Sequence, residues 1–132
     1  MGGEPTPTDR ELEILKILWR RGEATVREVY HEISRELPIV QNTVQAFLRT
    51  MEEKGLVEHR VERRSFIYRP LVGRDTTAGR LVSGLLDRVF DGATDQMVQS
   101  VLSLQKPTPE ELAKIEQMIV AARSSTKSQT KK

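Results

Sequence analysis

Three Thr-x-x-Glu segments, each just ahead of a periodic apolar run, constrain this chain most because they predict where helices begin. They lie at Thr8–Glu11, Thr25–Glu28 and Thr108–Glu111. In such a capping box, the threonine hydroxyl and the glutamate carboxylate satisfy backbone N–H groups that the first helical turn leaves free. The third box also has Pro109 at the first helical position, where no N–H is needed. The chain is therefore predicted to be mainly helical.

Apolar residues at spacings of three and four predict three short helices in the first part of the chain. They span residues 9–21, 26–36 and 41–54. Gly22 and Gly55 follow the first and third of them, and Pro38 follows the second, which are the residue types that end helices.

A β-hairpin is predicted directly after these helices. Residues 56–62 and 66–71 are rich in valine, isoleucine and aromatic residues, and the basic segment Arg63-Arg64-Ser65 separates them. Because Pro70 cannot donate to a ladder, the second strand should lie at an edge or end there. Three helices followed by a two-stranded hairpin predict a winged helix-turn-helix.

Beyond the hairpin, three more helices are predicted at residues 77–90, 95–104 and 109–123. Together they are too short to bury a core alone, and a second copy of the chain is the simplest partner. The predicted dimer interface comprises Leu81, Val82, Leu85, Leu86, Val89, Phe90, Met97, Val101, Leu102, Ile115 and Ile119. The predicted domains are a disordered N-terminus at 1–7, a winged helix-turn-helix at 8–74, a helical dimerisation region at 75–123 and a disordered polar tail at 124–132.

Composition excludes several classes of protein. The 132 residues include no cysteine, which removes disulfides, thiolate metal sites and cysteine nucleophiles, and the only two histidines, His31 and His59, lie far apart. No Gly-rich phosphate loop or metalloprotease motif is present, so we expect neither enzymatic activity nor a cofactor or metal. Without a signal pattern or a run of about 18 apolar residues, we expect a cytoplasmic protein that does not contact the membrane.

Charge is concentrated on the predicted hairpin, although the whole chain carries only +2. Residues 60–74 contain five arginines and one acid, a local charge of +4. Arginine suits phosphate contact because its guanidinium stays charged and donates bidentately. The alternative is that these charges only protect the edge of the hairpin. The predicted phosphate contacts are Thr25, Arg27, Arg60, Arg63, Arg64 and Arg69.

The third helix has a polar side that could read bases. Its candidate base-reading residues are Gln41, Asn42, Thr43, Gln45, Ala46 and Arg49. Glutamine and asparagine amides can pair with adenine bidentately in the major groove. The alternative is an ordinary solvated face, but beside a helix-turn-helix and a basic wing the reading as double-stranded DNA binding is favoured.

Three runs resemble the penicillinase-repressor family, the BlaI/MecI/CopY type of bacterial winged-helix regulators. They are TDRELEILKILWRRGEATVREVYHEI (8–33), NTVQAFLRTMEEKGLVEHR (42–60) and RSFIYRPLVGRD (64–75). The resemblance implies a homodimeric repressor on dyad-symmetric operators, often built around TACA/TGTA half-sites, with the last helices forming the dimer. By position it assigns base reading to Asn42, Thr43, Gln45 and Ala46, and phosphate contact to Arg60, Arg64 and their neighbours. Because the family commonly has threonine in place of Ala46 and arginine in place of Thr50, the operator is expected to differ from the usual one.

The resemblance also bears on the inducing signal. The copper-responsive branch uses a C-terminal cysteine cluster, which this chain lacks. The antibiotic-responsive branch, which controls β-lactamase or related stress operons, is inactivated by a membrane-sensor-linked protease at an Asn-Phe bond. The matching bond here is Ser100–Val101, which lacks the asparagine. The alternative function is a winged-helix protein-interaction module without specific DNA binding.

Overall fold

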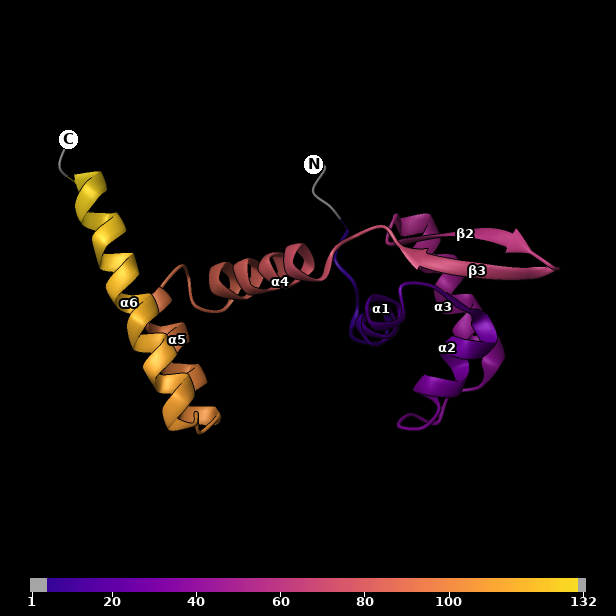
Figure 1. Cartoon of the computed structure of the whole chain (residues 1–132), viewed down its shortest axis with the longest axis horizontal. Helices are drawn as coiled ribbons and strands as arrows, with labels where there is room; N and C mark the ends of the chain where they lie inside the picture. The colour runs from indigo at the N-terminus through magenta and orange to yellow at the C-terminus, as the bar shows by residue number, and fades with distance from the viewer. Residues whose placement is uncertain (1–4, 131–132) are drawn as a thin grey trace. The chain divides into compact units, whose positions relative to one another are not determined.

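The computed structural model describes residues 5–130, with side chains described through residue 126. Its elements, labelled in Figure 1, are α1 (Asp9–Arg21), β1 (Ala24–Thr25), α2 (Val26–Ile33), α3 (Gln41–Lys54), β2 (Val57–Glu62), β3 (Ser65–Pro70), α4 (Arg74–Arg88), α5 (Thr94–Leu104) and α6 (Pro109–Thr130). The chain forms two compact units, one extending to Gly84 and one starting at Leu85.

All three predicted capping boxes are confirmed. The Thr8 hydroxyl accepts from the Glu11 N–H at 3.3 Å, and the Glu11 carboxylate accepts from the Thr8 N–H at 2.9 Å. The boxes at the starts of α2 and α6 close with distances of 2.8 to 3.1 Å. These bonds fix the entry of α1, α2 and α6 from contacts within four residues of sequence.

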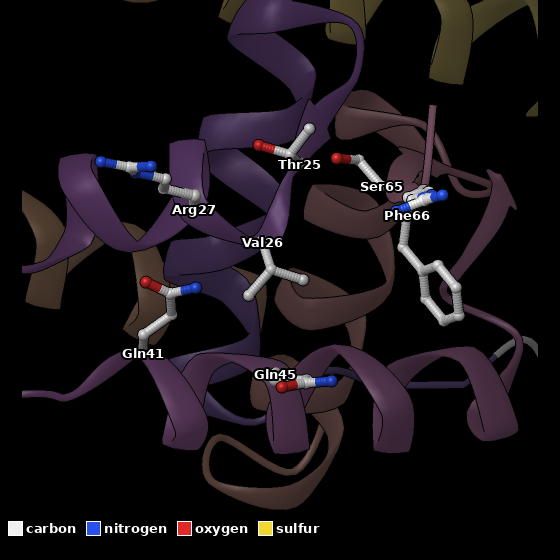
Figure 2. Close-up of a pocket in the computed structure, with 8 residues that line it drawn as sticks. Thr25, Val26, Arg27, Gln41, Gln45, Ser65 and Phe66 are labelled. Atoms are coloured by element: carbon white, nitrogen blue, oxygen red, sulfur yellow. The ribbon is translucent and has the colours of Figure 1, made fainter. Parts of the chain in front are cut away.

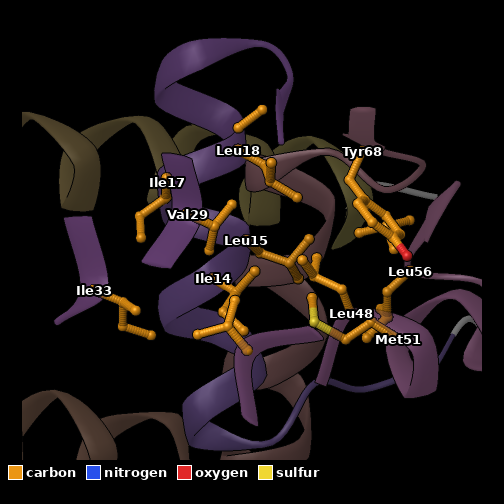
Figure 3. Packing of buried hydrophobic residues seen from close by; sticks show 13 residues of the cluster. Ile14, Leu15, Ile17, Leu18, Val29, Ile33, Leu48, Met51, Leu56 and Tyr68 are labelled. Carbon is orange, nitrogen blue, oxygen red and sulfur yellow. The ribbon is translucent and has the colours of Figure 1, made fainter. Parts of the chain in front are cut away.

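The core of the first unit lies where α1, α2 and α3 meet the sheet. Ile14, Leu15 and Leu18 of α1 are fully buried, as are Leu48 and Met51 of α3. Figure 3 shows how these side chains pack together with those of Val29, Leu56 and Tyr68. One face of α3 is buried by this packing, and its opposite face is exposed to solvent.

The sheet has a strand that the sequence did not reveal. Its order is β1-β3-β2, all antiparallel, because Ala24 and Thr25 pair with Tyr68 and Ile67 of the predicted hairpin. Two residues are too few to show the alternation that marks a strand. Pro70 lies at the very end of β3, as one of the two predicted alternatives required.

Several predicted boundaries are wrong. Helix α2 ends at Ile33, and residues 34–36 form a turn. The tail predicted to be disordered from residue 124 continues α6 to Thr130, because neither glycine nor proline interrupts the chain after Pro109. Residues 131–132 and residues 1–4 of the predicted disordered N-terminus lie outside the described residues.

The division between the two halves also differs from the prediction. Helix α4 begins at Arg74, and Thr77 on its first turns is buried in the first unit, which extends ten residues beyond the predicted boundary at 74. In the described part of the chain, no helix is both long and apolar enough to cross a membrane.

Candidate nucleic-acid interface

Helix α3 presents one polar face to solvent. Val44, Leu48 and Met51 bury its inner side against the core. The predicted base-reading residues Gln41, Asn42, Thr43, Gln45, Ala46 and Arg49 are all exposed. The packing therefore leaves these side chains available for an external partner, and their role in base reading stays a prediction.

A surface hollow of about 480 Å³ joins this face to α2 and to the wing, the hairpin of β2 and β3. Its lining residues are Thr25, Val26, Arg27, Gln41, Gln45, Arg64, Ser65 and Phe66. Figure 2 shows Gln41 and Gln45 on α3 with the labelled side chains of the α2 start and of the wing around them. Five of the eight were predicted as base or phosphate contacts, whereas Val26, Ser65 and Phe66 were missed because only the fold brings them to the hollow.

Two arginines form the turn of the wing. Arg63 and Arg64 have φ values of 51° and 68°, in the left-handed region that side chains other than glycine, asparagine and aspartate rarely adopt. Both are exposed, and neither has an ion pair within the described residues. Arg27, on the other side of the hollow, contacts the His31 ring at 3.4 Å and, among the residues that the structure describes, no carboxylate. These guanidinium groups are therefore not held by a carboxylate of the described part of the chain.

The other two predicted phosphate contacts on the wing, Arg60 and Arg69, form ion pairs with glutamates. Arg60 donates to Glu23 at 2.7 and 3.0 Å and to Glu62 at 3.2 Å, and Arg69 is ion-paired with Glu58. The Glu23 bond is the main reason that the pKa of Arg60 is raised, and the same bond lowers the pKa of Glu23. The local charge of +4 inferred from the sequence is thus partly cancelled by acids from other segments.

Strand alternation explains why the arginines separate into two groups. Arg60 and Arg69 lie on the opposite face of the sheet from Phe66 and Tyr68, because adjacent residues of a strand point to opposite sides. Neither Arg60 nor Arg69 lines the hollow, although both were predicted as phosphate contacts beside Arg64.

The predicted dimer interface, most of which lies in the second unit, is only partly covered. Within the described residues, no hydrophobic side chain after Tyr68 is fully buried. Of the predicted interface, Leu81, Leu86, Phe90, Met97 and Ile115 are half-buried, and Val82, Leu85, Val89, Val101, Leu102 and Ile119 are exposed. The predicted cleavage bond Ser100–Val101 lies inside α5, with Ser100 half-buried and Val101 exposed.

Comparisons with known proteins agree with this geometry. The family model described as penicillinase repressor matches residues 7–121. The penicillinase repressor of Bacillus licheniformis is 27% identical over 115 residues, which are 87% of this chain and 90% of that protein. The solution structure of the DNA-binding domain of the repressor BlaI is 31% identical with a TM-score of 0.50, covering 56% of this chain and 90% of that one. The chain therefore belongs to the penicillinase repressor family and is a winged-helix transcriptional repressor that binds operator DNA, not an enzyme.

Proposed function

We propose that this repressor binds a dyad-symmetric operator as a homodimer, with α3 of each copy in the major groove. The observation that carries the proposal is the hollow that unites α3, the start of α2 and the tip of the wing. Amides lie on one wall of the hollow, and guanidinium groups with no carboxylate partner among the described residues lie on the others. These two kinds of group match the two needs of operator recognition, which are base reading and phosphate contact. A protein-interaction module without specific DNA binding has no need of this combination.

The roles divide according to the walls of the hollow. Gln41 and Gln45, with the neighbouring Asn42, offer amides that can pair with adenine edges. Arg27 and Arg64 flank them and contact phosphate, helped at Arg27 by the positive end of the α2 dipole. Arg63 at the tip of the wing provides a further phosphate contact. Arg60 and Arg69 contribute less because their charge is already neutralised.

Dimerisation is supported by the state of the second unit. Its helices carry apolar side chains at helical spacing, yet Val89 is 63% exposed and Val101 is 50% exposed. A folded helical unit of this size without a buried core requires a partner. A second copy satisfies that requirement symmetrically and places two reading helices about 34 Å apart, or a multiple of that distance, on one side of the duplex.

Sedimentation together with operator titration tests the proposal. The operator is first selected from a random duplex library, and the full chain is then compared with a chain ending at Gly84, which retains the whole first unit. The full chain should sediment as a dimer at micromolar concentration, and the shortened chain should be monomeric and bind the operator far more weakly, because the half-sites no longer engage as one unit. A monomeric full chain, or undiminished affinity of the shortened one, would contradict it.

Inactivation by proteolysis, and with it the control of a β-lactamase or related stress operon, stays a prediction. Cleavage at Ser100–Val101 would separate part of α5 and all of α6 from the first unit. Since the bond lies within a helix, the helix must unwind locally before a protease can reach it. Mass spectrometry of the chain recovered from cells before and after β-lactam exposure tests this, and a chain that stays intact would contradict it.

A further inference from the structure

The end of the reading helix is joined to the wing by a polar contact. His59 of β2 donates through Nδ1 to the Glu52 carboxylate of α3 at a distance of 2.7 Å. The two side chains are 27% and 33% exposed, so the bond lies at the margin of the core and not within it. The bond therefore connects α3 with the hairpin and bears on the angle between them.

The His59 ring continues this contact into the wing. It stacks on Phe66 with ring centroids 4.2 Å apart and an interplanar angle of 14°. Tyr68, which is anchored in the core, also lies against the His59 ring, with centroids 5.3 Å apart and an interplanar angle of 45°. The three rings form a cluster, since Phe66 and Tyr68 lie 6.4 Å apart, and His59 connects the buried Tyr68 with the Phe66 ring, which is 42% exposed and lines the hollow.

This arrangement contributes more to geometry than to stability. A partly exposed polar contact adds little to folding stability, because water competes for both partners. A bond that fixes the angle of the wing, in contrast, acts on every contact that Arg64, Ser65 and Phe66 make together with Gln45 across the hollow. The groups of a binding site must be held close to the geometry that the partner requires.

We propose that Glu52 and His59 are positioning residues that lock the wing against α3 and hold the Phe66 ring as one wall of the hollow that receives the DNA backbone. The inference rests on the proposed function, since it assigns a purpose to the shape of the same site. Glu52 is not expected to contact DNA, and the Phe66 ring packs against the sugar edge of the backbone.

The test separates the reach of the Glu52 side chain from its charge. Glu52→Asp keeps the charge but is one methylene too short to reach His59, whereas Glu52→Gln loses the charge but keeps an acceptor oxygen at the same distance. Glu53, the next residue of α3, is exposed and has no ion pair within the described residues, so Glu53→Asp and Glu53→Gln are the matched controls.

In operator titrations of the full chain, the affinity of these variants should depend on whether the side chain at position 52 can reach His59. We expect Glu52→Asp to bind about fivefold more weakly than Glu53→Asp, which corresponds to about 1 kcal/mol. Glu52→Gln should bind within about twofold of Glu53→Gln. His59→Phe, which keeps the ring stack and loses the bond, should bind the operator with the same affinity as Glu52→Asp. A variant that combines both substitutions should bind no more weakly than either single variant, because both substitutions remove the same contact.

Each outcome decides between the two proposals. Failure of the wild-type chain to prefer its selected operator would overturn the proposed function. Specific binding by the wild type together with equal affinities for Glu52→Asp and Glu53→Asp would overturn only the positioning role. A fall in melting temperature of Glu52→Asp large enough to account for its weaker binding would show a merely structural role and would also overturn it.

Discussion

Replacing Arg63 by asparagine and Arg64 by glycine should make the wing more stable and the repressor weaker on DNA. Both arginines are at positive φ in a two-residue turn between the paired residues Glu62 and Ser65. Such turns favour Asn-Gly because both central residues must adopt the left-handed conformation. The natural sequence therefore keeps strain at this turn that a better turn sequence would remove.

The stability gain can be estimated from the backbone. A non-glycine residue in the left-handed region costs roughly 1 to 2 kcal/mol, of which asparagine recovers part and glycine most. Glycine at position 64 also gives the unfolded chain more conformational freedom, which reduces the stability gain by about 0.5 to 1 kcal/mol. The net gain is about 1 kcal/mol, which raises the melting temperature of a domain of this size by roughly 4 to 8 °C.

The loss on DNA follows from counterion release. Each phosphate contact contributes about 0.9 to the slope of log affinity against log salt. With two arginines lost per copy, the slope should become less steep by about 3.6 for the proposed dimer. Between 50 and 200 mM salt, the affinity of the wild type should therefore fall about 150-fold more than that of the variant.

The matched control removes the same charge from the other face of the wing. Arg60→Ala with Arg69→Ala also deletes two arginines per copy, but these are held by carboxylates in the structure. Its salt slope should stay close to that of the wild type. A turn variant with an unchanged slope and affinity would show that the tip of the wing does not touch phosphate, and a lowered melting temperature would refute the strain argument.

Further predictions concern the reading face, the core and acid stability. Gln45→Ala should weaken the free energy of operator binding by about 1 to 3 kcal/mol and that of non-specific binding much less, as measured by titration with operator and random duplexes. Equal losses on both duplexes would show that the bases are read by another face of the protein. Leu48→Ala, at a fully buried site, should lower the free energy of unfolding by about 3 to 5 kcal/mol in urea titrations, and a loss below about 1 kcal/mol would contradict the described core. Burial raises the pKa of Glu11, but the bonds from Lys54 and Thr8 outweigh it and lower the pKa overall. The stability that the ionised Glu11 contributes to the fold is therefore present above about pH 4.3 and lost as the pH falls further. Glu11→Gln should be less stable than the wild type at pH 7, and its stability should fall less steeply in acid. Parallel profiles of stability against pH for the two proteins would refute this.

The sequence alone was sufficient wherever the deciding contacts are local. A capping box involves residues three apart, so Thr8, Thr25 and Thr108 marked three helix starts that the structure confirms. The exposed face of α3 was likewise predictable, because the apolar positions of a helix identify its buried side and leave the rest to solvent. The family resemblance rests on these same local segments and is confirmed by the comparison with known repressors.

Only the tertiary structure decided which charges on the wing are free. Glu23 reaches Arg60 across 37 positions of sequence, and no local pattern reports a pairing over that distance. The same holds for β1, whose two residues form a strand only because β3 lies beside them. The stack of Phe66 on His59 and the bond between His59 and Glu52 likewise join residues of three different elements. Local hydrogen bonding and periodicity set the elements, but the packing of the elements determined which side chains meet at the proposed DNA-binding surface.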